Sequence, residues 1–441
     1  MSAHAGTRSS PASLEHPLPA GMRDLLPEEA SVRRALARQA LECFALRGYA
    51  VVTPPVFEFA EVLERGLGVL DPTDVLRFVE PESGEVAALR PDMTPQIARI
   101  IATRLRDRPP PFRLGYEGTV LRRRSGRARK HRQIPQVGVE LAGIAGPDGD
   151  LELLALAADA LRATGLTRFA LDIGDAGVVR ALLAPLPHAD QARISEGLGR
   201  KDAAEVAVAC AEAKAPHAEA LVALPDLHGG RDALVEGVLR LASTPAAPAA
   251  RRLLAFFDAA TNAGLGEYLS ADLGEVRGFA YYTGPVFHAY APGTGDAIGS
   301  GGRYDELLGR FGWDLPAAGF ALDLDRLGES LQAAGIGGRV AVRVVVVGPP
   351  HNPRLAQLRA RGIAAVASED RAAALAWARA WGFTHVADAA DAAGANGANG
   401  AATMTEWLDA ATGAVVASPL AGGLESTERP AREPQLERIG R

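Results

Sequence analysis

The stretch from Asp272 to Gly302 holds the residue types best suited to binding a small ligand. Glycine within a strand removes side chains where another group must approach the backbone closely. A sheet face of this kind, edged by tyrosines and an arginine, suits a small flat ligand that carries a carboxylate. The same pattern is also typical of a glycine-rich hairpin with ordinary core tyrosines, and a short motif alone does not separate the two. The residues concerned are Arg277, Tyr281, Tyr282, Tyr290 and the closing run Ile298–Gly302.

A second set of polar groups lies on two predicted antiparallel strands, 113–122 and 133–143. In the second strand the apolar residues Val137, Val139 and Leu141 alternate with Gln136, Gly138 and Glu140. A period of two places the last three on one face of the sheet. A buried carboxylate there needs a partner, which the ring N–H or the ammonium group of a ligand could supply. The pattern therefore predicts a polar shelf with open space above Gly138.

Asp92 and Thr94 lie where a helix is predicted to begin. Thr94 followed by Pro95 fits an N-cap and the first helical position, and the apolar residues that follow, such as Ile97 and Ile101, form a buried stripe. At the mouth of a helix both side chains could meet the polar groups of a ligand. Plain capping by Thr94 explains the pattern equally, and is the interpretation that the sequence alone favours.

The loop between the two polar strands, 122–132, is strongly basic. It holds seven arginines or lysines in eleven positions. Such a run is typical of a solvated loop or one that contacts nucleic acid. Because arginine forks match phosphate oxygens, the loop could equally close over phosphates.

The bulk properties exclude several classes of protein. A chain of 441 residues with 48% hydrophobic and 23% charged residues is long enough for two or three globular domains. A net charge of −6 gives no global attraction to nucleic acid. The sequence has no apolar run near the roughly 20 residues that span a bilayer and no apolar region of a signal peptide near its start, so we expect a cytoplasmic protein with no membrane partner. Cys43 and Cys210 fit reduced, buried thiols.

The remaining sequence predicts helices and strands in an order that defines the domains. We expect a mobile tail at 1–16, a core at 17–335 and a small C-terminal α/β domain at 339–423, with a flexible loop at 389–402 and a disordered tail at 424–441. Within the core, residues 178–264 read as a helical insert. Helices are predicted from Pro27 to Gly48, around 57–65, at 151–164 and at 303–311, and strands at 49–53, 76–80, 85–89 and 169–173; the segment 319–326 reads as a strand that runs into a helix.

Taken together, these motifs resemble the class II aminoacyl-tRNA synthetases, and specifically their histidyl branch. Arg122, Gln136 and Glu140 match motif 2 of that branch, and Gly319–Arg326 matches its motif 3. The other matching segments are Leu18–Glu28, Arg90–Thr94, Arg277–Gly284 and Gly301–Asp305. The resemblance implies an α+β fold, with an antiparallel sheet flanked by helices, a helical insert and a small C-terminal domain, and it implies a homodimer.

The resemblance also implies a histidine pocket. By that analogy Glu140 and Tyr282 hold the imidazole ring, Asp92, Thr94 and Gln136 hold the amino group, and Arg277 and Gln136 meet the carboxylate. Tyr304 lines the wall, and Arg122 and Tyr281 complete the predicted histidine-binding set. Arg277 and Tyr282 have opposite strand parity, so they can share a pocket only if Arg277 lies before the strand or in a bulge.

The nucleotide half of the synthetase pattern is altered. The glutamate that normally follows the motif 2 arginine is replaced by Arg124, a change of two charge units, and each close charge contact is worth about 4 kcal/mol at an effective dielectric near 20. Ala280 stands where the synthetase pattern has an acidic residue. Asp92 is shorter than the glutamate that the synthetase pattern has at its position. Asp323 and Asp325 occupy the usual glycine and glutamate positions of motif 3. We therefore expect that ATP is not bound as in a synthetase.

A kept histidine pocket beside an altered nucleotide site resembles the regulatory subunits of ATP phosphoribosyltransferase. That family implies a non-catalytic protein without metal or cofactor, which partners the short-form catalytic subunit in the first step of histidine biosynthesis. It implies a hetero-oligomer, no tRNA charging, and histidine as feedback inhibitor, with reciprocal coupling between histidine and the active partner state.

Two other hypotheses remain open at this point. One is a divergent but active histidyl-tRNA synthetase, favoured by the basic loop and disfavoured by Arg124, Ala280 and a C-terminal unit that is shorter than the anticodon-binding domain of a synthetase. The other is a synthetase-like module whose partner is RNA or a different enzyme. Histidine-dependent ATP–pyrophosphate exchange separates the first of these from the regulatory hypothesis, and co-purification with a small phosphoribosyltransferase separates the second.

Overall fold

The structure is a computed structural model that describes residues 18–67, 75–122, 131–276, 281–336, 342–388 and 407–416. Several sequence predictions lie outside these residues: the tail 1–16, most of the basic loop 122–132, Arg277, the loop 389–402 and the tail 424–441. The chain divides into two compact units, Met1–Ile336 and Gly337–Arg441.

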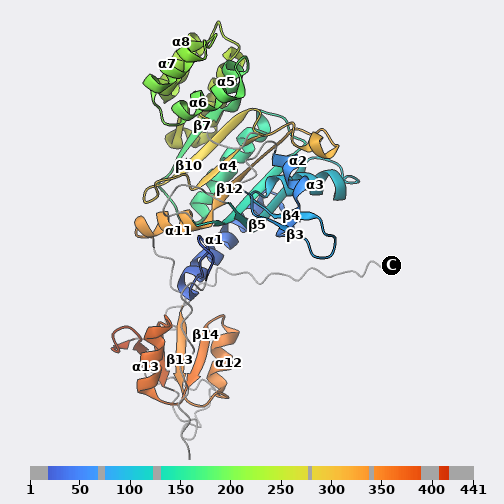
Figure 1. Cartoon of the computed structure of the whole chain (residues 1–441). Helices are drawn as coiled ribbons and strands as arrows, with labels where there is room; N and C mark the ends of the chain where they lie inside the picture. The colour runs from blue at the N-terminus through green and yellow to red at the C-terminus, as the bar shows by residue number, and fades with distance from the viewer. Residues whose placement is uncertain are drawn as a thin grey trace, which may run out of the picture. The chain divides into compact units, whose positions relative to one another are not determined.

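A nine-stranded sheet forms the centre of the first unit (Figure 1). Between β5 and β7 in the spatial order, each strand pairs antiparallel with the next. Outside this run, β1 pairs in parallel with β5, and β9 pairs in parallel with β7. The spatial order is β1 (Ala50–Val51), β5 (Phe112–Leu121), β6 (Gln133–Ala142), β12 (Ala317–Asp323), β11 (Gly299–Arg303), β10 (Pro285–Tyr290), β7 (Ala170–Asp175), β9 (Leu269–Asp272) and β8 (His228–Gly229).

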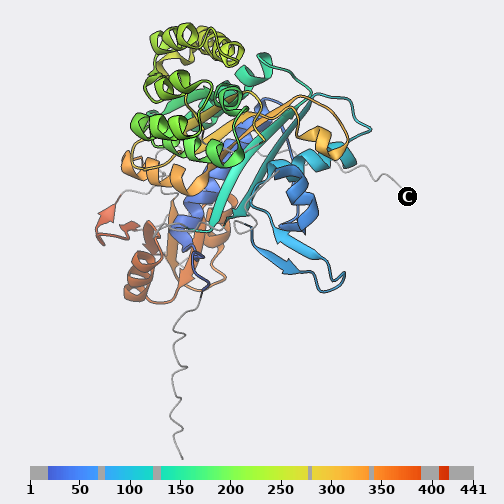
Figure 2. The ribbon, with the colours of Figure 1, turned by 45° about the horizontal axis from the view of Figure 1, so that its top comes forward.

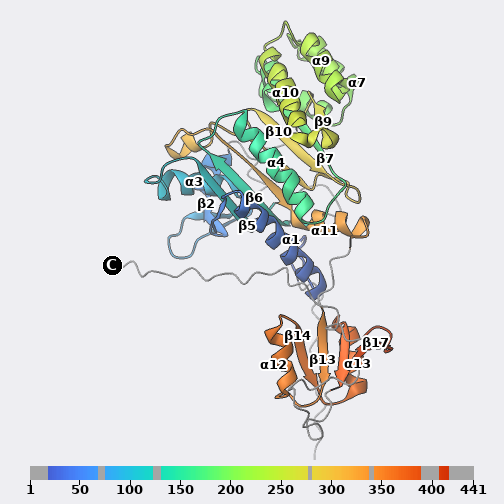
Figure 3. The same ribbon diagram turned by 180° about the vertical axis from the view of Figure 1, so that it is seen from behind.

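One face of this sheet packs against long helices. From behind, Figure 3 shows α1 (Pro27–Leu46), α4 (Asp148–Ala163) and α11 (Leu324–Ala333) across the sheet. The apolar residues of β6, such as Val139, lie in the same core as Leu36 and Phe44 of α1. Val32, Leu36, Ala40 and Phe44 recur every four residues, which predicts one buried face for α1. Val32 is exposed, so the buried face begins one turn later, at Leu36. The alternation in β6 therefore points its polar residues to the opposite face.

The opposite face carries α2 (Ala60–Leu67), α3 (Thr94–Arg104) and a three-stranded sheet, in the order β2 (Phe57–Phe59), β4 (Val86–Leu89) and β3 (Arg77–Val79). The helix predicted around 57–65 is wrong in its first three residues. Phe57 and Phe59 alternate with Glu58, a period of two, and they pair with β4. The helix begins only at Ala60.

The insert stands at the β7 side of the sheet and is mainly helical (Figure 2). It is not wholly helical as predicted, because β8 pairs antiparallel with β9 and so adds an edge strand to the sheet. Its helices are α5 (Ala176–Leu183), α6 (His188–Gly199), α7 (Ala203–Glu212), α8 (Ala218–Ala223), α9 (Arg231–Arg240) and α10 (Ala247–Ala260), with short turns at Leu224–Asp226, Thr261–Leu265 and Gly266–Tyr268.

The helix predicted at 303–311 is also wrong. Arg303 is the last residue of β11, and only Leu308–Phe311, labelled η5, forms a short 3₁₀ turn. The buried Arg303 guanidinium is bound by Asp150 of α4 and by Asp305, both at 2.7 Å. A charge taken out of water needs such partners, and they fix the end of the strand.

The second unit is a small α/β domain with a five-stranded sheet. Its three parallel strands agree with the apolar runs at 344–347, 363–366 and 385–386 that predict strands, and its two helices agree with the helical patterns at 353–361 and 371–381. Two short antiparallel strands were not predicted. The sheet order is β14 (Ala364–Ser368), β13 (Arg343–Val347), β15 (His385–Asp388), β16 (Trp407–Asp409) and β17 (Val415–Val416), and the helices are α12 (Pro353–Ala360) and α13 (Arg371–Ala380).

The predicted α+β class is confirmed by this architecture. Among the described residues, no helix combines the length and the apolar character that crossing a membrane requires. Both cysteines are free, but Cys43 is only half-buried, whereas Cys210 is buried as expected.

Candidate functional site

The polar face of β6 points toward the core that α3 and the tyrosines share. Gln136 and Glu140 are both buried on this face, and Glu140 is only 3% exposed. The structure thus brings together the residues of the predicted shelf. The predicted open space above Gly138 is wrong, because an added Cβ would lie 2.6 Å from the Tyr116 hydroxyl and 2.4 Å from the Phe320 carbonyl. The glycine makes room for Tyr116 of the neighbouring strand.

Thr94 binds Glu140 and does not cap its own helix. The N-cap position of α3 is Met93, with no side-chain hydrogen bond. The Thr94 hydroxyl instead donates to Oε1 of Glu140 at 2.7 Å. The other carboxylate oxygen, Oε2, has no hydrogen-bond partner among the described residues. Plain capping is therefore wrong for Thr94, which ties the start of α3 to the sheet.

Asp92 lies beside this pair and is 4% exposed. Its Oδ2 accepts a hydrogen bond of 2.6 Å from the Tyr281 hydroxyl, and its Oδ1 accepts one of 3.4 Å from the Thr94 backbone N–H. Arg122 fixes the same turn, because its Nε donates to the Pro91 carbonyl at 2.8 Å. Residues that are distant in sequence are thus joined in one polar cluster.

Three tyrosine rings cover the cluster. The ring centroid of Tyr281 lies 5.1 Å from that of Tyr282 and 5.5 Å from that of Tyr304. The Tyr304 hydroxyl is buried and has no hydrogen-bond partner among the described residues. An added Cβ at Gly319 of β12 would lie 2.6 Å from that hydroxyl and 2.0 Å from Glu140 Oε2, so the glycine gives both side chains their space.

The tyrosine- and glycine-rich stretch from Asp272 to Gly302 does not form one continuous strand face. β9 ends at Asp272 and β10 begins at Pro285, so Tyr281 and Tyr282 precede a strand and the parity conflict with Arg277 does not arise. Arg277 itself lies outside the described residues. Tyr290 is the last residue of β10 and pairs with Ala170, away from the other tyrosines.

Burial controls the electrostatics of the cluster. Burial raises the pKa of the Glu140 carboxyl well above its ordinary value; the hydrogen bond from Thr94 opposes this, and the charge of Asp92 adds to it. Burial also raises the pKa of Asp92, against the nearby charge of Arg122. Two carboxyl groups that disfavour ionisation in this way favour a ligand with a positive or N–H-donating group, which would stabilise their charged forms.

The cavity that Thr94, Glu140 and Tyr304 of this cluster help to line is small. It measures about 10 Å³, roughly the space for one water molecule. Any larger ligand must therefore move side chains to enter. The residues that line it are Thr94, Ala98, Ile101, Glu140, Leu141, Ala142, Tyr304, Leu308 and Ala317.

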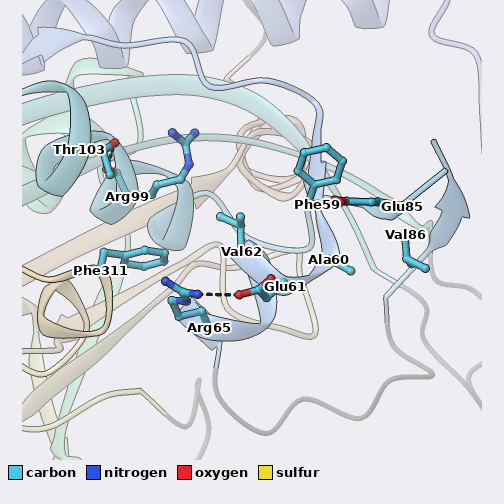
Figure 4. A pocket seen from close by; sticks show the side chains of 10 residues that line it. All are labelled: Phe59, Ala60, Glu61, Val62, Arg65, Glu85, Val86, Arg99, Thr103 and Phe311. Carbon is cyan, nitrogen blue, oxygen red and sulfur yellow. Dashed lines mark hydrogen bonds and ion pairs between the residues drawn. The ribbon is translucent and has the colours of Figure 1, made fainter. Parts of the chain in front are cut away.

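A wider hollow of about 440 Å³ lies on another side of α3 (Figure 4). It is lined by Phe59, Val86, Arg99 and Phe311 among others, and Glu61 and Arg65 form an ion pair at its rim. It contains none of the predicted site residues. Its larger size does not make it the better candidate, because it lacks the converging buried polar groups of the small cavity.

Sequence reasoning missed Tyr116 and Gly319. Tyr116 is 1% exposed, and burial raises its pKa well above the ordinary value, with the charge of Glu140 adding to the effect. Its place was open to prediction, since antiparallel pairing of two strands around one loop sets Tyr116 opposite Gly138. Gly319 lies opposite Glu140 across β6 and β12, a pairing that no local pattern reveals.

Comparison with known proteins places this architecture in a family. The sequence model of the family described as histidyl-tRNA synthetase matches residues 21–327. An ATP phosphoribosyltransferase regulatory subunit of Moorella thermoacetica is 41% identical over 329 residues, which cover 73% of this chain and 84% of that protein. One from Anaeromyxobacter sp. strain K is 43% identical over 332 residues, covering 74% and 94% respectively.

Solved structures agree with the sequence relatives. A Bacillus halodurans protein described as an ATP phosphoribosyltransferase regulatory subunit/histidyl-tRNA synthetase superposes with a TM-score of 0.72 at 29% identity, over 85% of this chain and 98% of that one. The histidyl-tRNA synthetase of Nostoc sp. PCC 7120 has a TM-score of 0.73 at 23% identity, over 92% and 97%, which shows a shared fold. The chain therefore belongs to the histidyl-tRNA synthetase-like proteins and, among them, to the family of ATP phosphoribosyltransferase regulatory subunits.

Proposed function

We propose that this chain is the non-catalytic regulatory subunit of an ATP phosphoribosyltransferase. It assembles with the short-form catalytic subunit, is required for the first step of histidine biosynthesis, and transmits feedback inhibition by histidine. The observation that carries the proposal is the 41–43% identity to regulatory subunits over 84–94% of their length. The buried polar cluster supports the histidine part independently.

Histidine is proposed to bind in the cluster around Glu140. The unpartnered acceptor Glu140 Oε2 and the hydroxyl of Tyr304 suit the two ring nitrogens of an imidazole or its nearest substituents. Asp92 and Gln136 suit the amino group, since Gln136 Oε1 is a buried acceptor with no partner among the described residues. Arg277 is assigned to the carboxylate by resemblance alone.

Binding must open the cavity, because about 10 Å³ does not hold an amino acid. The Tyr281–Asp92 hydrogen bond uses an oxygen that the amino group of the ligand would need. We therefore propose that histidine replaces this hydrogen bond. Since Asp92 also accepts a hydrogen bond from the backbone N–H of Thr94, the first residue of α3, that exchange would move a helix end, and a state change of this kind is what couples a ligand to a partner subunit.

The stretch that matches motif 3 is occupied by internal ion pairs, which supports the absence of aminoacylation. Asp325 accepts hydrogen bonds from Arg23 at 2.8 Å and from Arg33 at 2.7 Å. Asp323 accepts from the first backbone N–H groups of α11. Arg326 binds Asp296 at 2.7 Å. These charges hold segments of the chain together, which supports the proposal that the stretch does not bind ATP as in a synthetase.

A homodimer is proposed on the evidence of exposed apolar side chains. A contiguous exposed apolar patch marks an interaction surface. Several large apolar side chains on β1 to β4 and on the link before β2 are at least 43% exposed. They are Val51, Val56, Phe57, Phe59, Val79 and Val86. Phe59 and Val86 also line the hollow of Figure 4. Sedimentation of the purified chain should show a dimer, and Phe57→Glu should shift it toward monomer.

Reconstitution tests the whole proposal. The purified chain, mixed with a short-form catalytic subunit, should switch on ATP phosphoribosyltransferase activity, and histidine should inhibit the mixture. Neither chain alone should be active. Histidine-dependent ATP–pyrophosphate exchange, or charging of tRNA by the isolated chain, would overturn the proposal in favour of a synthetase. Failure of histidine to bind would remove the sensing role.

A further inference from the structure

A second polar cluster lies at the β9 end of the same sheet, apart from the cluster around Glu140. Asp172 of β7 stands directly opposite His288 of β10. Asp272 is the last residue of β9, which runs parallel beside β7, and Glu275 follows three residues later. Strand register therefore brings an imidazole and two carboxyl groups together, and the segment that follows β9 adds a third carboxyl group.

The three carboxyl groups are spaced as candidate ligands of one metal ion, and His288 approaches them at Glu275. One carboxylate oxygen from each of Asp172, Asp272 and Glu275 lies within 4.8 Å of the other two. His288 Nε2 lies 3.8 Å from Glu275 Oε1. That distance is too long for a hydrogen bond, but two ligands that are each about 2.0–2.2 Å from a shared ion lie about 3–4 Å apart.

The His288 side chain supplies an observation that is independent of the acidic residues. His288 is 7% exposed, and its Nε2 has no hydrogen-bond partner among the described residues. A buried polar atom left without a partner costs about 1–3 kcal/mol. The nitrogen points at Glu275, which is 6% exposed. A ligand for this nitrogen is thus the missing element of the cluster.

Lys201 places a positive charge beside Asp272, at one side of this second polar cluster. Its ammonium group contacts both carboxylate oxygens of Asp272 at 2.5 Å. Lys201 comes from the turn between α6 and α7 of the insert, and its backbone φ of 57° lies in the left-handed region that non-glycine residues rarely adopt. Asp172 accepts a hydrogen bond of 2.7 Å from Ser270. Lys201 is therefore the partner of Asp272 in this cluster.

We propose that Asp172, Asp272, Glu275 and His288 bind one divalent transition-metal ion, in competition with the Lys201 ammonium. One imidazole nitrogen with carboxylate oxygens suits Zn²⁺ or Mn²⁺, whereas Mg²⁺ prefers oxygen ligands alone. Entry of the ion displaces the lysine from Asp272, which loosens one contact between the insert and the sheet. The site would therefore make the position of the insert sensitive to metal.

Calorimetric titration tests the proposal on the full chain after treatment with a chelator. Zn²⁺ and Mn²⁺ should each bind at one equivalent, and Mg²⁺ should bind much more weakly. His288→Ala should weaken the binding of Zn²⁺ and of Mn²⁺ at least about tenfold, since even the loss of a residue behind the ligands lowers metal affinity 10–100-fold. Lys201→Met should strengthen the binding of both ions by about tenfold or more, because a competing cation is removed.

Matched controls keep the test decisive. His188→Ala changes an exposed histidine at the start of α6 and should leave binding unchanged. Circular dichroism checks that each variant is folded. Electron paramagnetic resonance of the chain with Cu²⁺ as a probe should show nitrogen coupling that His288→Ala removes. Absence of binding to the wild-type chain, or binding that His288→Ala and Lys201→Met both leave unchanged, would overturn the proposal.

Discussion

Replacing Glu140 by glutamine separates ligand recognition from folding at the proposed histidine site. The substitution keeps the size and shape of the side chain, and an amide oxygen can still accept the 2.7 Å hydrogen bond from Thr94. What is lost is the negative charge that Oε2, an acceptor without a partner among the described residues, would offer to the imidazole N–H. We therefore expect Glu140→Gln to weaken histidine binding while the fold persists.

The size of the effect follows from the kind of contact. A hydrogen bond to a charged group contributes about 1.5–3 kcal/mol, which is about a 10- to 150-fold change in Kd. The stability of the free protein should change in the opposite direction. Because burial raises the pKa of Glu140 in the folded state, unfolding releases a proton once the pH exceeds the ordinary carboxyl range. Stability is then lost as pH rises toward the folded pKa, and a neutral amide removes this loss.

Two measurements check this prediction. Calorimetry with histidine at pH 7.5 should give the weaker Kd, and thermal unfolding at the same pH should give a Tm no lower than that of the wild type. Glu117→Gln is a matched control, since Glu117 is an exposed residue of the neighbouring strand β5 and should alter neither value. Unchanged histidine affinity in Glu140→Gln would show that the site has been put in the wrong place.

Three further predictions use the same proposed site and its supports. Arg277→Ala should weaken the binding of histidine more than that of histidinol, which lacks the carboxylate. Equal losses of affinity in calorimetry would show that Arg277 does not contact the carboxylate. Histidine affinity should rise with pH through the raised pKa values of Asp92 and Glu140, because only an ionised carboxylate attracts the ligand's positive group; a pH series should be less steep in Asp92→Asn, and an equally steep series would exclude Asp92. Gly138→Ala should destabilise the fold by about 1–3 kcal/mol or more in urea unfolding, since its Cβ would meet the Phe320 carbonyl at 2.4 Å. Gly295→Ala, with nothing within 4 Å, should be near neutral.

Periodic patterns were enough to predict most of the first unit. The alternation through β6 told correctly which side chains share a face with Glu140, because side-chain direction in a strand depends only on parity. The parallel half of the second unit was predicted for a similar reason, since its strands are short apolar runs between clear helices. Short edge strands such as β8, β16 and β17 carry too few residues to show a period.

Contacts between distant segments were beyond the sequence patterns. Thr94 looked like a cap because its neighbour is a proline, yet its partner Glu140 lies 46 residues away. The space assumed above Gly138 is filled by Tyr116, and pairing across the loop was needed to see it. In both cases local propensity was outweighed by a tertiary hydrogen bond or by close packing.

The small size of the cavity at Glu140 and Tyr304 has a consequence for how a histidine sensor of this kind would respond to the concentration of histidine. If the form that admits histidine is a minor population, the apparent dissociation constant equals the intrinsic one divided by that fraction. A form present at about 1% would therefore shift the half-saturation point upward about 100-fold. Mutations that merely loosen the lid of aromatic rings would then lower the concentration at which biosynthesis is shut off, without touching any group that contacts the amino acid.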